Sequence, residues 1–373
     1  MIINKGNKVI VAMSGGVDSS VSAWLLKKQN YQVEGLFMKN WEEDDNKQYC
    51  SSKKDLDDAK NVCNQLGLHL HTINFSIEYW KKVFLNFLNE YKKGNTPNPD
   101  ILCNKEIKFK LFLNFAITNL GGNYIATGHY VRKKKINNQV VLLRAFDKNK
   151  DQSYFLYTLN QYQIKKTLFP IGELTKQEVR RIAYNINIQV ANKKDSTGIC
   201  FVQPKNFTNF LHRYFPIIPG KIVTIEKEVI GEHIGLTYYT LGQRKGLNIG
   251  GIKEKKSLPW YVAEKNISLN LLIVVQGRNN PYLMSIGLIV KNIHWINKYD
   301  LLTKDIKCSV QIRHLQKSVT CKVSIINNKC VKVFLYYPMF AVTPGQSAVF
   351  YLDERCLGGG VIKSRFPLLS CKM

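Results

Sequence analysis

The chain has 373 residues, of which 45% are hydrophobic and 22% are charged, and these are ordinary values for a globular protein. This length is sufficient for two or three domains with a substantial core. No apolar run approaches the length of a membrane span, and the N-terminal segment lacks the apolar stretch and cleavage site of a secretory signal. We therefore expect a cytoplasmic protein with no membrane segment.

The charge balance is strongly positive, since 54 Lys and Arg residues against 27 Asp and Glu residues give a formal charge of +27. One interpretation is a polyanionic partner, most simply a nucleic acid. The other is a drift in composition, because Lys, Asn and Ile are abundant along the whole chain. The charge alone does not decide between the two.

Predicted strands and helices alternate over residues 1–215. Strands are expected at 8–13, 32–38, 70–75 and 123–128, and helices at 19–30, 54–67, 76–93, 105–119 and 174–185. Thr175, followed three residues later by Glu178, forms a capping box at the start of the last helix. This alternation predicts an α/β domain with a doubly wound parallel sheet.

The pattern changes after residue 215. Residues 216–278 contain many glycines between short alternating runs, which predict a small β-rich central domain. Residues 279–373 contain short strands between turn signals, which predict a C-terminal barrel or sandwich. The lysine-rich segment 131–139 is typical of an exposed hairpin turn.

The segment SGGVDS, Ser14–Ser19, lies between the first predicted strand and the first predicted helix. Its glycines let the backbone approach a ligand closely, and its N–H groups and hydroxyls form an anion cradle at a helix N-terminus. The Gly-Lys-Ser/Thr ending of a Walker loop is absent. The segment instead resembles the SGGxDS loop of PP-loop ATP pyrophosphatases. That resemblance implies that Ser14–Ser19 hold the pyrophosphate part of ATP and that Asp18 helps to organise Mg²⁺.

Two residues at other strand ends are candidates for the same site. Met38 ends the second strand, where its polarizable thioether suits contact with adenine, although an ordinary core position is the alternative. Gly128 follows another strand, at the edge where open α/β sheets bind ligands, although a simple turn glycine is the alternative.

Nine cysteines are present, and none forms a CxxC pair or a zinc-type cluster, so most are expected to be small buried hydrophobes. Two lie in more suggestive surroundings. Cys103 falls in a predicted surface loop, before Lys105 and a helix start, and both features lower the pKa of a thiol. Cys200 follows shortly after the cations Lys193 and Lys194.

Seven segments in chain order carry a more specific signature. They are GLFMKNWEEDD (35–45), NPDILCNKEIKF (98–109), ATGHY (126–130), KDQSYFLY (150–157), DSTGICF (195–201), LGQRKGL (241–247) and PGQSAVFY (344–351). Together they resemble the bacterial tRNA-specific 2-thiouridylase family. The resemblance implies a PP-loop (HUP-like) domain, a small central domain that contacts tRNA, and a C-terminal β-barrel.

The resemblance also implies a mechanism with ATP and Mg²⁺, in which Cys103, Cys200 and Asp18 are the catalytic residues. ATP adenylates O2 of the wobble uridine of tRNA. Cys200 carries a persulfide, received from an upstream sulfur-relay protein, and its terminal sulfur attacks C2 of the base. Cys103 then releases that sulfur and leaves a Cys103–Cys200 disulfide. The products are 2-thiouridine, AMP and pyrophosphate.

Binding residues follow from the same resemblance. Those implied for ATP are Ala12, Met13, Ser14, Gly15, Gly16, Val17, Asp18, Ser19, Met38 and Gly128. Those implied for tRNA are Asn98, Pro99, Asp100, His129, Lys150, Asp151, Gln152, Arg313, His314 and Gln346. The expected substrates are tRNAs for Lys, Glu and Gln, whose target base must leave its stack. Capping of a turn by Asn98 and Asp100, and packing of His129, are simpler roles that stay open.

Three other functions fit parts of the sequence. A PP-loop amide-forming enzyme would use the phosphate loop without Cys103 or Cys200. A different PP-loop tRNA enzyme would make lysidine or thiolate another position. A non-enzymatic RNA-binding protein would use only the positive charge and would not convert ATP to AMP.

Overall fold

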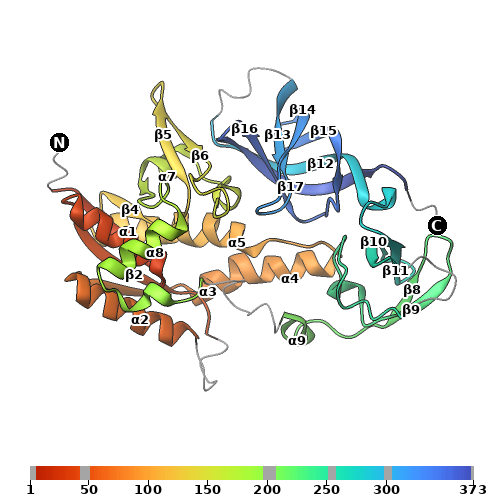
Figure 1. The fold of residues 1–373 in the computed structure, drawn as a ribbon, viewed down its shortest axis with the longest axis horizontal. Helices are drawn as coiled ribbons and strands as arrows, with labels where there is room; N and C mark the ends of the chain where they lie inside the picture. The colour runs from red at the N-terminus through yellow and green to blue at the C-terminus, as the bar shows by residue number, and fades with distance from the viewer. Residues whose placement is uncertain (1–5, 43–50, 196–206, 251–257, 298–304, 371–373) are drawn as a thin grey trace.

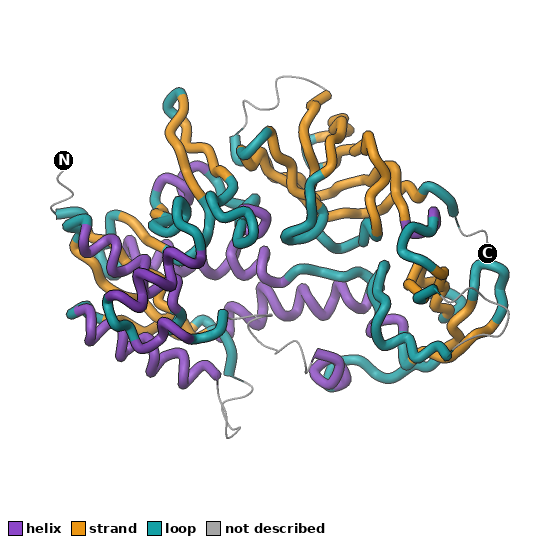
Figure 2. Tube along the Cα trace, in the orientation of Figure 1, coloured by secondary structure: helices purple, strands orange, loops and turns teal. Residues whose placement is uncertain are grey.

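The computed structural model describes residues 6–42, 51–195, 207–250, 258–297 and 305–370. Helices gather around the N-terminal part of the chain, whereas the C-terminal part is built mainly from strands (Figure 1; Figure 2). Cys200 lies outside the described residues. Within the described residues, no helix has the length and apolar character needed to cross a membrane.

A five-stranded parallel sheet forms the centre of the N-terminal domain, in the order β3-β2-β1-β4-β7. Its strands are β1 (Lys8–Met13), β2 (Gln32–Lys39), β3 (Leu70–Asn74), β4 (Tyr124–Ala126) and β7 (Thr167–Leu168). Val9, Ile10 and Val11 of the central strand are fully buried, because helices cover both faces of the sheet. The predicted doubly wound α/β fold is confirmed.

Helices α1 (Val17–Lys28) and α2 (Ser51–Leu66) pack on one face of this sheet, over a core that includes Val9 and Val11. Beside α1 lies α8 (Lys176–Asn185), whose predicted capping box is present with both hydrogen bonds between Thr175 and Glu178. The short helix α7 (Gln161–Lys165) precedes β7.

Two long helical segments cover the other face. The first runs through α3 (Ser76–Tyr79), a π-helical turn (Trp80–Phe84) and α4 (Leu85–Lys92), which confirms the helix expected at 76–93. The second runs through α5 (Pro99–Leu102), a π-helical segment (Cys103–Phe112) and α6 (Leu113–Thr118). The prediction of a loop at Cys103 is therefore wrong, because Cys103 lies within the second helical segment. Helix begins at Pro99, because the Asn98 side chain caps it and proline at the first position loses no helical hydrogen bond.

The predicted lysine-rich hairpin is present as β5 (Arg132–Ile136) and β6 (Gln139–Leu143). Its turn residues, Asn137 and Asn138, have φ angles of 44° and 66°, which suit a two-residue hairpin turn. The sequence did not indicate where this hairpin docks. Strand β6 pairs with β17 of the C-terminal barrel, so the N-terminal domain extends the barrel sheet.

After α9 (Phe207–His212) comes a four-stranded middle sheet, in the order β10-β11-β8-β9. Its strands are β8 (Gly220–Val223), β9 (Val229–His233), β10 (Trp260–Asn266) and β11 (Leu271–Gln276). A C-terminal barrel follows, built from β12 (Met284–Trp295), β13 (Asp305–Gln311), β14 (Val319–Asn327), β15 (Cys330–Phe340), β16 (Ser347–Leu352) and β17 (Arg355–Pro367). Antiparallel pairing of β12 with β17 closes this barrel, which confirms the predicted C-terminal β-barrel.

A shared core joins the N-terminal domain to the barrel. Val349, Tyr351 and Cys356 of the barrel are buried in the same cluster as Tyr154 and Tyr157. The Tyr154 hydroxyl lies 2.9 Å from the carbonyl oxygen of Ser347 and 3.2 Å from that of Ile312. Burial raises the pKa of Tyr154, so this hydroxyl stays protonated and donates. The aromatic residues of the 150–157 segment therefore belong to the core.

Replacing Tyr154 by Phe removes a buried donor while conserving the ring. We expect the free energy of unfolding to fall by about 1–3 kcal/mol, because buried carbonyl groups of the barrel lose their partner. Denaturant unfolding of the variant measures this loss, and Tyr184→Phe, at a side chain that is 74% exposed, is the control. Equal stability of the two variants would contradict the proposed interdomain role of the hydroxyl.

Candidate active site

The phosphate loop turns sharply between β1 and α1. Gly15 has a φ of +68°, and a Cβ atom there would lie 2.2 Å from the carbonyl oxygen of Asp55, so only glycine fits. Ser19 fixes the loop from within, since its hydroxyl lies 3.0 Å from the Gly16 carbonyl oxygen and 3.3 Å from the Ser14 amide nitrogen. Hydrogen bonds of Ser19 thus fix the conformation of the loop at the N-terminus of α1. The N-terminus of a helix is a favourable position for an anion.

Gly128 lies directly against this loop. A Cβ atom at Gly128 would come within 2.8 Å of the Asp18 carbonyl carbon and of the Ser19 amide nitrogen. The chain that leaves β4 therefore contacts the first turn of α1, at the carboxyl edge of the sheet. The structure brings together Gly128 and the Ser14–Ser19 loop, as the sequence predicted, and the close approach explains the glycine.

Asp18 faces an ammonium group. Its carboxylate oxygens lie 2.7 and 2.9 Å from Lys176 Nζ, and the Tyr130 hydroxyl donates to it at 2.7 Å. Burial and the Asp18 charge raise the pKa of Tyr130, so its hydroxyl remains a donor. Sequence reasoning missed both partners, because nothing in the sequence distinguishes Lys176 from the other lysines. Its place directly after the helix cap at Thr175 was the one available signal.

Lys176 also joins Asp18 to a second carboxylate. Its Nζ lies 2.8 Å from Asp195 Oδ1, and Asp195 is bound in addition by Lys150 at 2.7 Å and Arg180 at 3.1 Å. Burial of Asp195 would raise its pKa, but the hydrogen bonds from Lys150 and Lys176 prevail and lower that pKa to about 2. Asp195 precedes Cys200 by five residues, so this ionic cluster fixes the start of the cysteine segment near the phosphate loop.

A second lysine holds the loop from the side of α2. Lys193 Nζ donates to the Gly15 carbonyl oxygen at 2.9 Å and pairs with Asp55 and Asp58. The proximity of Lys193 to Cys200 is known from the sequence alone, since Cys200 lies outside the described residues. The Lys193 ammonium positions the backbone of the phosphate loop against α2.

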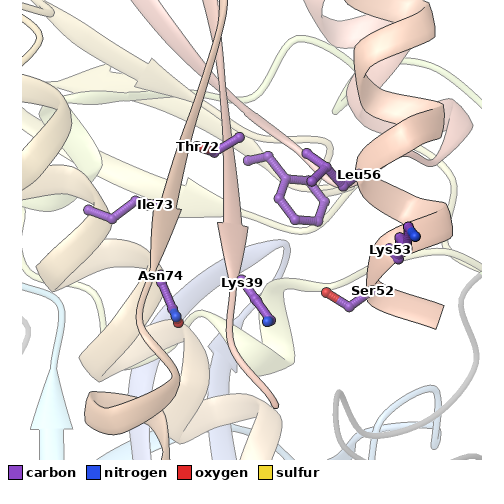
Figure 3. A pocket seen from close by; sticks show the side chains of 8 residues that line it. Lys39, Ser52, Lys53, Leu56, Thr72, Ile73 and Asn74 are labelled. Carbon is purple, nitrogen blue, oxygen red and sulfur yellow. The ribbon is translucent and has the colours of Figure 1, made fainter. Parts of the chain in front are cut away.

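A cavity of about 580 Å³ opens at the same edge of the sheet, between β2, β3 and the start of α2 (Figure 3). Lys39 and Asn74 end the two strands, and Ser52 and Lys53 begin the helix. Phe37 lines this cavity. Met38 is not among the lining residues and packs against the core that includes Ile10 and Leu36, since successive side chains of a strand point to opposite faces. The predicted contact of Met38 with adenine stays a prediction.

Cys103 is buried, with 4% of its surface exposed, in the core beneath the sheet. The expectation of an exposed thiol is therefore wrong. Because the helix begins at Pro99, Cys103 lies within its first turns. The Cys103 side chain is buried in the same apolar cluster as Ile101 and Ile107. Asn98 adopts the capping role that was left open, since its side-chain oxygen accepts from the Asp100 amide at 3.1 Å.

Two titratable groups of the N-terminal domain, Asp100 and His129, have unusual environments. Burial raises the pKa of Asp100 to about 6, although the positive charge of Lys108 acts in the opposite direction. Burial and, secondarily, Lys108 lower the pKa of His129 well below its ordinary value, so His129 is neutral at pH 7. The His129 ring lies 2.8 Å from the Thr127 hydroxyl, with 9% of the residue exposed, which favours packing over a surface role.

Two predicted tRNA residues, Asp151 of the N-terminal domain and His314 of the barrel, are in contact although they lie 163 positions apart in the chain. His314 Nε2 lies 2.9 Å from the Asp151 carbonyl oxygen, and its ring packs on Phe155 at 4.5 Å. Several polar groups of the predicted tRNA residues, however, serve the fold. The Asp151 carboxylate is buried and accepts from Arg144 and Ser153, and Gln152 accepts from the Tyr130 amide.

Two more predicted tRNA residues connect domains. Arg313 donates to the carbonyl oxygens of Leu241 and Ala341, and the Gln346 amide donates to the Thr96 carbonyl oxygen at 2.7 Å. The Arg313 guanidinium is largely enclosed by the middle domain and the barrel. Burial accordingly lowers the pKa of Arg313.

No cluster of three or more potential metal ligands occurs within the described part of the chain. Asp18, the predicted magnesium residue, directs both carboxylate oxygens at Lys176. These residues do not fit a metal ion that the protein would hold by itself. A magnesium ion is usually bound by one or two protein carboxylates together with the phosphates of a substrate. Here the Lys176 ammonium lies against the Asp18 carboxylate, where such an ion would bind.

A parallel α/β sheet with a two-glycine loop at its carboxyl edge defines a nucleotide-binding domain of the HUP class. Three family descriptions match the chain in order: a tRNA methyl transferase HUP domain over residues 7–204, a tRNA methyl transferase PRC-barrel domain over 208–276, and an aminomethyltransferase beta-barrel domain over 285–362.

Three similar proteins from different bacteria carry the same name. A tRNA-specific 2-thiouridylase MnmA of Buchnera aphidicola (from Acyrthosiphon pisum) is 63% identical over 99% of this chain and 100% of its own length. Proteins of the same name from Proteus mirabilis and Salmonella typhimurium are 59% and 58% identical over 97% of this chain and 98% of their own lengths. The chain belongs to the tRNA-specific 2-thiouridylase (MnmA) family.

Replacing Asp100 by Asn tests its buried environment. The carboxyl has a folded pKa of about 6 and an ordinary value of 3.8, so the folded state binds the proton more tightly. The fold therefore loses stability as the pH rises from 3.8 to about 6, and the loss is constant above that range. We expect Asp100→Asn to be more stable than the wild type at pH 8, by an amount on the order of 1–3 kcal/mol, with the difference vanishing towards pH 4.

Denaturant unfolding at the two pH values measures the effect. Asp353→Asn is the matched control, since Asp353 lies in an exposed turn with a φ of 51°, which asparagine tolerates. A loss of stability in Asp100→Asn that is equal at both pH values would refute the interpretation.

Proposed function

We propose that this protein thiolates tRNA, by adenylating the C2 oxygen of the wobble uridine with ATP and then transferring sulfur from a cysteine persulfide to C2. The single observation that supports this best is the Lys176 ammonium. It lies 2.7 Å from Asp18 in the phosphate loop and 2.8 Å from Asp195, which begins the DSTGIC segment of Cys200. One cation thus joins the element suited to phosphates with the element that carries the proposed sulfur.

Activation of the base is the first proposed step. The Ser14–Ser19 loop would hold the β and γ phosphates, and the backbone at Gly128 would border the α phosphate. The uridine O2 attacks that phosphorus, the bond to the β phosphate breaks, and pyrophosphate leaves. Mg²⁺ would arrive bound to the triphosphate and neutralise part of its charge. Lys176 and Lys193 keep the loop in place, through Asp18 and through the Gly15 carbonyl.

Sulfur transfer is the second proposed step. The terminal sulfur of a Cys200 persulfide attacks C2, and AMP leaves with the C2 oxygen. The Cys103 thiolate then attacks Sγ of Cys200, which breaks the S–S bond, leaves the sulfur on the base and forms a Cys103–Cys200 disulfide. An external dithiol supplies two electrons to reset the enzyme. Because Cys103 is buried, this exchange requires the helix start at Pro99 to open when tRNA binds.

The surroundings of the target base follow from the same proposal. Asn98 caps the helix whose first residues, Pro99 and Asp100, precede Cys103, and burial raises the pKa of the Asp100 carboxyl to about 6. A flipped uridine seated there would have a hydrogen-bonding group beside its edge and the thiol below it. We further propose tRNAs for Lys, Glu and Gln as substrates, a persulfide-relay protein as the sulfur donor, and the cytoplasm as the compartment.

The decisive experiment is incubation of the full chain with tRNA, ATP, Mg²⁺ and a persulfide source, followed by mass spectrometry of the nucleosides. We expect 2-thiouridine from the wild type and none from Cys103→Ser or Cys200→Ser, while both variants still release pyrophosphate. Cys330→Ser, at a partly exposed thiol of the barrel, is the control and should act as the wild type.

Different outcomes support the alternatives. Full turnover in both active-site variants would indicate an amide-forming enzyme, a different modified nucleoside would indicate another tRNA enzyme, and no AMP would indicate an RNA-binding protein.

Replacing Gly128 by Ala tests the contact between β4 and the phosphate loop. The added methyl group would lie 2.8 Å from backbone atoms of Asp18 and Ser19, so the loop must shift. We expect ATP-dependent pyrophosphate release to fall at least tenfold with little change in tRNA affinity. Gly250→Ala, where a Cβ atom meets nothing within 4 Å, should retain the wild-type rate. Equal loss in both variants, or parallel loss of tRNA affinity, would contradict this assignment.

A further inference from the structure

A second cavity, of about 470 Å³, lies where the three domains meet. The end of the first long helical segment contributes Lys93 and Asn95, strand β10 of the middle domain contributes Lys265, and the barrel contributes Lys363 and Arg365. None of the predicted site residues lines this cavity. Figure 1 shows α4 extending from the parallel sheet towards the middle domain, which brings these parts of the chain together.

The lining of the cavity carries an excess of positive charge. The lining includes four cationic side chains, Lys93, Lys265, Lys363 and Arg365, and one carboxylate, Glu264. Lys93 also pairs with Glu90 at 3.0 Å, and Arg365 also donates to two backbone carbonyl oxygens at 2.9 and 3.1 Å. The hydroxyl group of Ser364 adds a neutral donor. Concave sites with several convergent donors and an excess of positive charge are suited to anions, and above all to phosphate.

Lys265 carries the strongest indication of a missing anion. Its Nζ donates to the Tyr239 carbonyl oxygen at 3.1 Å, and a neutral carbonyl does not balance an ammonium charge. Burial lowers the pKa of Lys265 to about 8, so the group remains mostly protonated at neutral pH at an energetic cost. An anion in the cavity would remove that cost, whereas the exposed ammonium of Lys363 would add attraction at the rim.

The cavity is directly connected to the proposed substrate turn. Asn95, in its wall, is followed by Thr96, whose amide donates to the Pro344 carbonyl oxygen at 3.0 Å and whose hydroxyl lies 3.3 Å from that of Thr240. Thr96 is thus fixed by both the barrel and the middle domain. Asn98 follows two residues later, so the cavity wall lies within about 11 Å of the turn along the chain.

We propose that this junction cavity binds a backbone phosphate of the tRNA whose uridine is modified, and so couples docking of the RNA to the position of the 98–103 turn. This inference rests on the proposed function. It names the RNA rather than a free phosphate ion, because the cavity borders the segment that leads to the target base. The charge of +27 also favours an extended polyanion over a small ion.

Lys363→Gln tests the proposal without disturbing the core, because Lys363 is exposed. Its matched control is Lys329→Gln, which removes the same charge from an exposed turn of the same barrel. Titration of each variant with tRNA over a range of salt concentrations gives the affinity and its log–log slope. We expect Lys363→Gln to bind several-fold more weakly, with a slope shallower by about one, and Lys329→Gln to match the wild type.

Amine labelling of Lys265, read by mass spectrometry, is the second measurement. An amine with a pKa of about 8 reacts readily, and tRNA should protect it in the wild type. Inorganic phosphate is the second arm. Protection by inorganic phosphate but not by tRNA would overturn the assignment to RNA. Unchanged labelling in both arms, or identical salt slopes for the two variants, would overturn the site itself.

These readouts report binding and not thiolation, so they separate the two proposals. Absence of 2-thiouridine formation by the wild type, together with the predicted salt response of Lys363→Gln, would reject the proposed chemistry and keep the phosphate site. Normal thiolation by Lys363→Gln with wild-type affinity would reject the phosphate site alone.

Discussion

The ammonium group of Lys176 lies between two carboxylates from distant parts of the chain, Asp18 and Asp195, and the arrangement of the site depends on it. A largely buried cation needs compensating charge, and removal of one member of such a group leaves an uncompensated charge that costs several kcal/mol. The phosphate loop, the start of α8 and the approach to the Cys200 segment are therefore positioned together. Lys193 makes a similar set of contacts on the other side of the loop. Its ammonium donates to the Gly15 carbonyl oxygen and pairs with two carboxylates of α2.

The domains are joined by buried contacts. The barrel and the N-terminal domain share one aromatic core around Tyr154 and Tyr351, and the β5–β6 hairpin extends the barrel sheet. Arg313 and Thr96 bind the middle domain to both neighbours. A long RNA that touches all three domains would therefore meet a preorganised surface, and its binding energy need not be spent on assembling the domains.

Burial of the Cys103 region has a physical consequence for the proposed chemistry. A thiol in an apolar core is protected from adventitious oxidation, but it is also a poor nucleophile until it is exposed or deprotonated. Asp100, which is costly to ionise in this environment, lies at the turn that would have to open. Binding of the RNA at this helix start would then expose the Cys103 thiol for the proposed sulfur transfer. The proposed phosphate site in the junction cavity, which Asn95 lines, would couple RNA binding to this change.

The sequence by itself determined the alternating α/β order, the capping box at Thr175, the lysine-rich hairpin and the phosphate loop, because each depends on local backbone chemistry or on a two- or three-residue period. It also placed Gly128 correctly, since carboxyl ends of parallel strands converge. Only the tertiary structure decided which lysines face Asp18, that Asp151 and Arg313 serve the fold, and that Cys103 is buried. Those outcomes depend on which residue, distant in the sequence, neutralises or covers a side chain. The local sequence pattern does not specify such long-range contacts.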